Sequence, residues 1–223
     1  MSRSDTTEVA QDYVSQSFSQ EMQYIRTVRP APIADGTRHK SYFFPKDNPE
    51  LVFYVEVTPR TLSIAGDSYY SAYFQLQMRD FFAADLAEVW GTDAILDVLV
   101  FSSNRVDLRT PANFDRKQPI AGTLEEMASV FHEDAFNRYG FDFNIHVSRT
   151  IGSDADKMSE ANSILKFIEI MQDSSFAPSS LRLHYNKPRA GILDRVFSDT
   201  QIEILIRNWQ NITSADEVLA LMP

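Results

Sequence analysis

The sequence predicts an α+β protein: a mixed, largely antiparallel sheet of about five strands, helices packed mainly on one face, and an N-terminal amphipathic helix. Apolar and polar residues alternate along 141–150 and 179–186, as in half-buried strands. Segments with helical periodicity and capping residues lie between the strands. Hydrophobic residues make up 43% of the 223 residues, enough to bury a sizeable core.

The first third of the chain combines a helix with a hairpin. From about residue 5 to 27, apolar side chains recur at helical spacing, which predicts an amphipathic helix. Residues 29–40 have the Pro, Gly and polar content of a connector. Residues 50–67 alternate around a Thr-Pro-Arg turn, which predicts a β-hairpin. We therefore expect an N-terminal arm at 1–28, a connector at 29–40 and a single α+β domain at 41–223.

The middle of the chain has one ambiguous stretch and one clear strand. Residues 68–91 begin with strand-like alternation, but from about residue 79 to 90 the spacing is helical, with Gly91 as the stop signal. The apolar run at 94–103 predicts a central strand. Residues 104–122 are polar and predict a long loop.

The second half alternates helices with strands. Thr123 and Glu126 form a capping box that predicts a helix over 123–140. The elements expected after it are a strand over 141–150, a helix over 153–173, a strand over 179–186, and helices over 198–212 and 213–222.

Composition excludes several classes of function. The chain carries 21 basic and 31 acidic residues, a net charge of −10, which disfavours a broad nucleic-acid-binding surface and suits a basic partner. The absence of cysteine excludes disulfides, thiolate nucleophiles and thiolate metal sites. No apolar run approaches the roughly 20 residues needed to span a bilayer, and the polar N-terminus lacks a signal-like core. We therefore expect a cytoplasmic protein without a membrane association.

Two predicted strands carry titratable side chains on their polar faces. Asp142 and His146 share the polar face of the strand over 141–150, and Arg182 and His184 point outward from the next strand. If the strands are neighbours, two imidazoles could act as acid and base around a phosphate held by Arg182. This pattern suits a small hydrolase, most plausibly a phosphodiesterase. An ordinary solvated sheet face gives the same alternation.

Two weaker patterns suggest metal chemistry. Glu88, Asp97, Asp107 and Arg109 run in the order of a metal-dependent nuclease site, but arginine is a poor proton acceptor where a lysine is expected. His132 has acidic neighbours, yet adjacent helical positions point apart. We therefore expect neither a metal site nor a cofactor.

The leading hypothesis is a non-enzymatic protein–protein interaction module: an adaptor, inhibitor, immunity-type or structural component with an acidic surface that includes aromatic residues. No phosphate-binding loop, dinucleotide fingerprint or nucleophile elbow is present. The candidate binding residues are Tyr54, Tyr69, Tyr70 and Tyr73, since aromatic side chains supply affinity at interfaces. The expected partner is another protein, for which the acidic charge suits a basic one, or a second copy in a homo-oligomer. The two-histidine hydrolase is the alternative.

Overall fold

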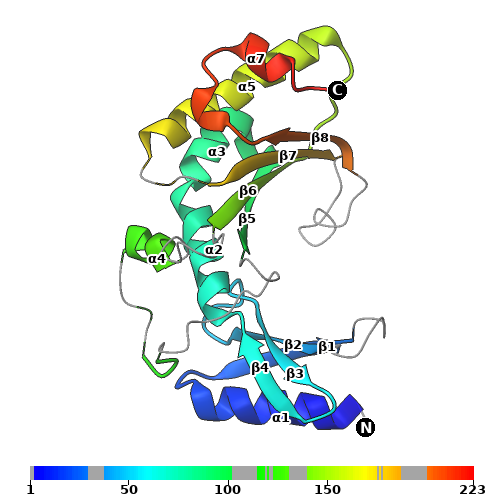
Figure 1. Cartoon of the computed structure of the whole chain (residues 1–223), viewed down its shortest axis with the longest axis vertical. Helices are drawn as coiled ribbons and strands as arrows, with labels where there is room; N and C mark the ends of the chain where they lie inside the picture. Colours follow the sequence, from blue (N-terminus) through cyan, green and yellow to red (C-terminus); the bar gives the residue numbers. More distant parts are fainter. Residues whose placement is uncertain are drawn as a thin grey trace. The chain divides into compact units, whose positions relative to one another are not determined.

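In the part of the chain that the structure describes, two four-stranded sheets are accompanied by helices, which confirms the α+β class (Figure 1). The computed structural model describes residues 3–29, 38–101, 115–118, 120, 123–130, 140–174, 176, 178–186 and 200–223. The chain divides into two compact units. The first comprises residues 1–76 and 106–123, and the second comprises residues 77–105 and 124–223. The expected single sheet of about five strands is therefore wrong in detail.

The described elements, in chain order, are α1 (Arg3–Ser17), β1 (Met22–Val28), β2 (His39–Pro45), β3 (Phe53–Thr58), β4 (Ser63–Asp67), α2 (Tyr69–Phe81), α3 (Ala83–Trp90), η1 (Gly91–Asp93), β5 (Ala94–Phe101), α4 (Leu124–Val130), β6 (Gly140–Val147), α5 (Asp154–Asp173), β7 (Ser180–Asn186), β8 (Thr200–Ile206), η2 (Trp209–Asn211) and α7 (Ala215–Leu219).

An antiparallel meander in the order β1-β2-β3-β4 forms the first unit, and α1 covers one of its faces. Ala10 and Val14 of α1 and Phe18, the first residue after it, recur every fourth residue, so they lie on one side and are buried. Phe18 meets Phe53 of β3 at a ring-centroid distance of 5.4 Å, and Phe43 of β2 lies 5.9 Å from Phe53. The core of this unit is therefore an aromatic layer between α1 and the sheet.

A buried carboxylate links three parts of the first unit. The Asp67 side chain is fully buried and accepts hydrogen bonds from the Tyr13 hydroxyl at 2.6 Å and the Arg116 Nε at 2.8 Å. It also accepts from the backbone N–H of Tyr69 at 3.0 Å, in the first turn of α2. Asp67 thus joins α1, the Arg116 segment and the start of α2, and it satisfies one of the free N–H groups at that helix end.

The second unit contains a sheet in the order β5-β6-β7-β8, in which only the β6–β7 pair is parallel. Parallel neighbours need a crossover, and α5 lies in the connection between β6 and β7. Phe82, Phe143 and Phe167 bring the α2–α3 junction, β6 and α5 together, with ring centroids 5.4–5.9 Å apart. Trp90 packs on Phe167 at 5.5 Å. Helices α3 and α5 therefore share one apolar layer against this sheet, and α7 lies beside α5 (Figure 1).

A second buried carboxylate lies inside that layer. Glu160 of α5 is 3% exposed and accepts hydrogen bonds from the Tyr185 hydroxyl at 2.9 Å and from the Trp90 indole N–H. The Arg149 Nη1 lies 3.3 Å from the same carboxylate. Burial, together with the Glu160 charge, raises the pKa of Tyr185 far above its ordinary value. We call Glu160, Trp90, Arg149 and Tyr185 the Glu160 network.

The helix expected over 5–27 is wrong in its second half. Helix α1 ends at Ser17, and residues 22–28 form β1, which pairs antiparallel with β2. The segment MQYIRTV is rich in β-branched and aromatic residues, which fit a pleated surface. Its apolar spacing of three to five does not distinguish a helix from a strand.

The helix expected over 198–212 is also wrong. Residues 200–206 form β8, paired antiparallel with β7, and only a short 3₁₀ turn follows. Ile202, Ile204 and Ile206 occupy every second position and therefore point to one face, and Ile204 and Ile206 are buried. This period of two outweighs the capping residues that predicted a helix.

The other expected elements have mixed outcomes. The 50–67 hairpin is confirmed by the antiparallel β3–β4 pair, and the 153–173 and 213–222 helices and both alternating strands are confirmed. Residues 68–91 are helical apart from their ends, which resolves the ambiguity. The expected central strand over 94–103 is an edge strand, β5. The 123–140 helix is confirmed for 124–130, and most of 104–122 lies outside the described residues.

Within the part of the chain that the structure describes, no helix is long and apolar enough to cross a membrane.

Replacing Glu160 with Ala should lower the free energy of unfolding by about 3 kcal/mol, because two buried donors and the partly exposed Arg149 lose their acceptor. Urea denaturation measures this change. Glu169→Ala, at an exposed position of the same helix, is the matched control and should change stability by less than about 0.5 kcal/mol. Equal effects of the two variants would contradict a structural role for the network.

Alkaline pH should weaken the second unit through Tyr185. Since its pKa is raised in the folded protein, its contribution to stability is fully present below the ordinary tyrosine pKa of 10.0 and is lost as pH rises above it. Denaturation series between neutral pH and pH about 11 should show a smaller loss of stability for Tyr185→Phe than for the parent. A parallel decline in both proteins would argue against this linkage.

Candidate functional site

His146 and His184 lie side by side on the adjacent parallel strands β6 and β7. They are direct register partners, and their rings stack with centroids 4.7 Å apart and planes 11° apart. Both belong to the sheet face opposite the one that carries Phe143 and Tyr185. The sequence analysis expected the two histidines to meet only if their strands were neighbours. The structure shows that the strands are paired and that the histidines are in contact.

Carboxylates flank the histidine pair on both sides. Glu203 of β8 is the register partner of His184, and its Oε2 lies 4.0 Å from the His184 Nδ1. The other Glu203 oxygen lies 3.3 Å from the Arg182 Nη1. Asp97 of β5 interacts electrostatically with His146. We call His146, His184, Arg182, Asp97 and Glu203 the histidine cluster.

Burial dominates the titration of the cluster. It lowers the pKa of His146, and the Asp97 charge opposes that shift. Burial also lowers the pKa of His184, assisted by His146 and Arg182 and opposed by Glu203. Desolvation raises the pKa of Asp97. Both imidazoles are therefore neutral at pH 7, and each has one nitrogen that can accept a proton or bind a metal.

Two polar atoms of the cluster lack a hydrogen-bond partner among the described residues. They are the Nδ1 of His146 and the Nε of Arg182, and both are buried. Buried polar atoms are rarely left unpaired, because each costs about 1–3 kcal/mol. The two atoms therefore have hydrogen-bonding capacity that no described residue uses.

Asp142, the fourth predicted catalytic residue, lies on the same face but not in the cluster. It is four residues before His146 on β6, a separation of about 13 Å along an extended strand. The structure therefore groups three of the four predicted catalytic residues, and it adds Asp97 and Glu203. Glu203 was missed because its segment was expected to be a helix.

The candidate binding tyrosines occupy different environments. Tyr69 packs against Phe18 and Phe53 in the first core, and Tyr70 is also buried. Tyr54 and Tyr73 are partly exposed, and the Tyr54 ring lies 4.1 Å from the Lys40 ammonium. Only Tyr54 and Tyr73 of the four thus present surface to a partner.

The residues of the nuclease-like pattern do not form a group among the described residues: Glu88 lies on α3 and Asp97 on β5. Glu88 is exposed on α3 and pairs with Lys166 at 2.7 Å, which lowers its pKa. Asp107, Arg109 and His132 lie outside the described residues. In the described ranges, no group of three or more His, Asp or Glu side chains is placed to hold a metal ion.

Strand β1 exposes an apolar surface that the sequence pattern did not indicate. Tyr24, Ile25 and Val28 are 38%, 43% and 38% exposed, and β1 is an edge of its sheet. A groove of about 510 Å³ lies beside it, lined by α1, the α1–β1 connection, β1 and β2, with Phe18 and Met22 among its apolar residues. We call these three side chains and the groove the β1 surface.

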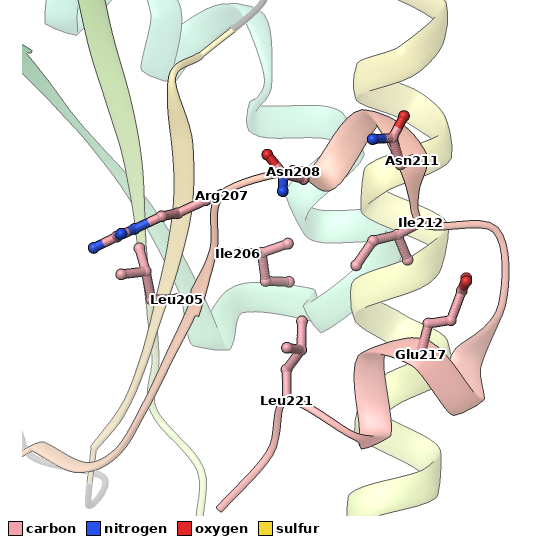
Figure 2. A pocket seen from close by; sticks show the side chains of 8 residues that line it. All are labelled: Leu205, Ile206, Arg207, Asn208, Asn211, Ile212, Glu217 and Leu221. Carbon is pink, nitrogen blue, oxygen red and sulfur yellow. The ribbon is translucent and has the colours of Figure 1, made fainter.

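A second groove, of about 480 Å³, lies in the other unit between the end of β8, η2 and α7. Figure 2 shows Ile206, Ile212 and Leu221 turned toward one another across it, whereas the Arg207 side chain points away. The Glu217 carboxylate in its lining already accepts hydrogen bonds from the Thr213 and Ser214 backbone. The groove is therefore apolar at its centre and lacks converging charged groups among its lining residues.

Comparison with known proteins gives one structural likeness. No family model matches the sequence, and no curated protein matches it. The crystal structure of a DUF5037 family protein from Ruminococcus gnavus is similar, with a TM-score of 0.52 and 11% sequence identity. The match covers 97% of this chain and 88% of that chain. At this identity the likeness concerns the fold alone.

Replacing Tyr69 with Ala should destabilise the protein by about 3 kcal/mol or more, as expected for an aromatic side chain lost from a core. Tyr73→Ala should cost less than half of that, because Tyr73 is partly exposed. Chemical denaturation of the two variants measures the difference. Similar losses would show that Tyr73 is as structural as Tyr69.

Proposed function

We propose that the protein is a non-enzymatic protein–protein interaction module that binds its partner through the β1 surface. The observation behind the proposal is the concentration of exposed apolar side chains there. Of the seven large hydrophobic side chains exposed among the described residues, three lie on this seven-residue strand. Clustered apolar exposure of this kind is typical of interaction sites, whereas single exposed residues are ordinary.

The shape of β1 favours side-chain docking over addition of a partner strand. The β1–β2 register shifts between Tyr24 and Arg26, so Ile25 lies in a bulge. Bulges interrupt the regular ladder that an added strand would need. Ile25 is 43% exposed, and the preceding residue, Tyr24, lines the α1 groove, where an apolar side chain of a partner could pack.

Charge supports a basic partner. The net charge of −10 would accelerate encounter with a positively charged protein, and the apolar and aromatic side chains would supply the affinity. An adaptor, an inhibitor or a structural component would all use such a surface. Self-association through the same strand is the competing arrangement.

Replacing Ile25 with Asp should weaken partner binding by at least tenfold, the cost of about 1.4 kcal/mol or more at an interface centre. Crosslinking to the proteins of a cell lysate, quantified by mass spectrometry, measures hetero-association, and light scattering of the purified protein measures self-association. Met158→Asp is the control, because Met158 is 37% exposed but lies on α5 of the second unit. Identical partner profiles for both variants, or a wild-type protein that is monomeric and captures nothing, would reject the proposal.

A second candidate function, phosphodiester hydrolysis, is favoured by the stacking of His146 on His184. Both imidazoles are neutral at pH 7 and could accept a proton, and Arg182 could hold a phosphate oxygen. One feature weighs against it: an in-line displacement needs acid and base on opposite sides of the phosphorus, whereas stacked rings lie side by side.

Assay of a panel of generic phosphodiesters tests the hydrolase. Activity that falls by at least about 100-fold in both His146→Ala and His184→Ala would support it, given the usual contribution of acid–base catalysis. His39→Ala is the control, since His39 belongs to the first unit and bonds to Thr6. A wild-type protein without turnover, or cluster variants as active as the parent, would eliminate this candidate.

A further inference from the structure

Strand β8 is an edge of its sheet, and among the described residues it pairs with β7 alone. An edge strand presents N–H and C=O groups on its free side, and proteins commonly protect such edges with a proline, a lysine or a bulge. The β8 sequence TQIEILI contains neither proline nor lysine. Its register with β7 is regular from Ile202 to Ile206, and the register shift in this pair precedes that stretch. The β8 edge can therefore accept a further strand, whereas the β1 edge carries a bulge.

The charges along β8 are complementary to those of a second β8 strand. Glu203, Leu205 and Arg207 occupy every second position and therefore lie on one face. Figure 2 shows Leu205 and Arg207 on the same side of the strand, opposite Ile206. The Glu203 side chain is 47% exposed, and the exposed Arg207 forms no ion pair with another described residue. In an antiparallel pair of identical strands centred on Leu205, Glu203 of each copy lies opposite Arg207 of the other.

We propose that two copies of this chain pair antiparallel through β8, around a two-fold axis at Leu205, so that their four-stranded sheets continue into one another. Two opposite-charge pairs across the strands stabilise this register. A pair centred on Glu203 would place the two glutamates opposite each other, and one centred on Ile204 or Ile206 would leave Arg207 without an opposing carboxylate. A two-fold pairing uses the same edge of both copies, so it ends at a dimer.

The apolar groove at the end of β8 adjoins this edge. Ile206 lines the groove together with Ile212 and Leu221, and Leu221 is 45% exposed. In the proposed register, Ile204 of the second copy lies opposite Ile206 and on the same face of the sheet. The added strand therefore extends the apolar face beside the groove. The β1 surface belongs to the other unit, so this inference does not rest on the proposed function.

Sedimentation velocity of the full wild-type chain over a concentration series tests the dimer without a variant, and we expect a monomer–dimer equilibrium. Arg207→Glu places carboxylates opposite each other at two symmetric positions and should raise the dimer dissociation constant by at least about tenfold. The double variant Glu203→Arg/Arg207→Glu restores opposite charges and should recover most of the affinity.

Two controls separate this edge from other surfaces. Arg29→Glu makes the same change of charge at an exposed position of the first unit, and Ile25→Asp alters the β1 surface. Both should dimerise as the wild type does, and circular dichroism establishes that each variant is folded. A wild-type chain that stays monomeric at every concentration, or a dimer that Ile25→Asp disrupts and Arg207→Glu does not, would overturn the proposal.

A single introduced cysteine tests the register, because the chain has no cysteine of its own. Directly opposed Cα atoms of antiparallel strands lie about 4.5–5.5 Å apart, within the range that a disulfide spans. Leu205→Cys should therefore form a disulfide between two copies under mild oxidation, seen on a non-reducing gel. Met158→Cys, at a 37% exposed position of α5, should not. Equal crosslinking of the two variants, or none for Leu205→Cys, would refute the two-fold axis at this residue.

Discussion

The burial of the Glu160 carboxylate is the constraint on which the second unit depends. A charge removed from water must be compensated, and here Trp90, Arg149 and Tyr185 supply the donors. These residues come from α3, the segment after β6, and β7, so a single side chain of α5 fixes the position of three other parts. The aromatic layer of Phe82, Phe143 and Phe167 would tolerate small shifts, but the directional hydrogen bonds would not.

The first unit uses the same device with different residues. Asp67 is buried, and it accepts from a tyrosine hydroxyl, an arginine and the first turn of a helix. In both units, the helix that covers the sheet thus connects to a strand or strand end through a tyrosine–carboxylate hydrogen bond. Buried polar contacts of this kind exclude alternative alignments of helix and sheet, even where their net contribution to stability is small.

The helices and strands that the sequence predicted correctly are those with a pattern contained in one segment of the chain. Strands β6 and β7 and helix α5 were predictable because alternation and helical spacing are both recognised within one segment. Strands β1 and β8 were not, because Met22–Val28 and Thr200–Ile206 owe their conformation to pairing with β2 and β7. A local sequence pattern does not determine which strands pair. The sequence therefore could not distinguish two four-stranded sheets from a single sheet. The histidine pair was foreseen as a possibility, whereas Glu203 lay in a segment expected to be a helix.

The parallel pairing of β6 with β7 has a consequence for the order of folding. A slip of one residue would turn His184 toward α5 and Tyr185 toward the opposite face, so the bond between Tyr185 and Glu160 also determines that the two imidazoles meet. Parallel strands joined through a long helix are non-local contacts, and their loop-closure entropy must be overcome before they form. We therefore expect the imidazole stack to assemble late, after α5 has docked. Histidine chemical shifts that reach native values before α5 amides gain protection from exchange would contradict this order.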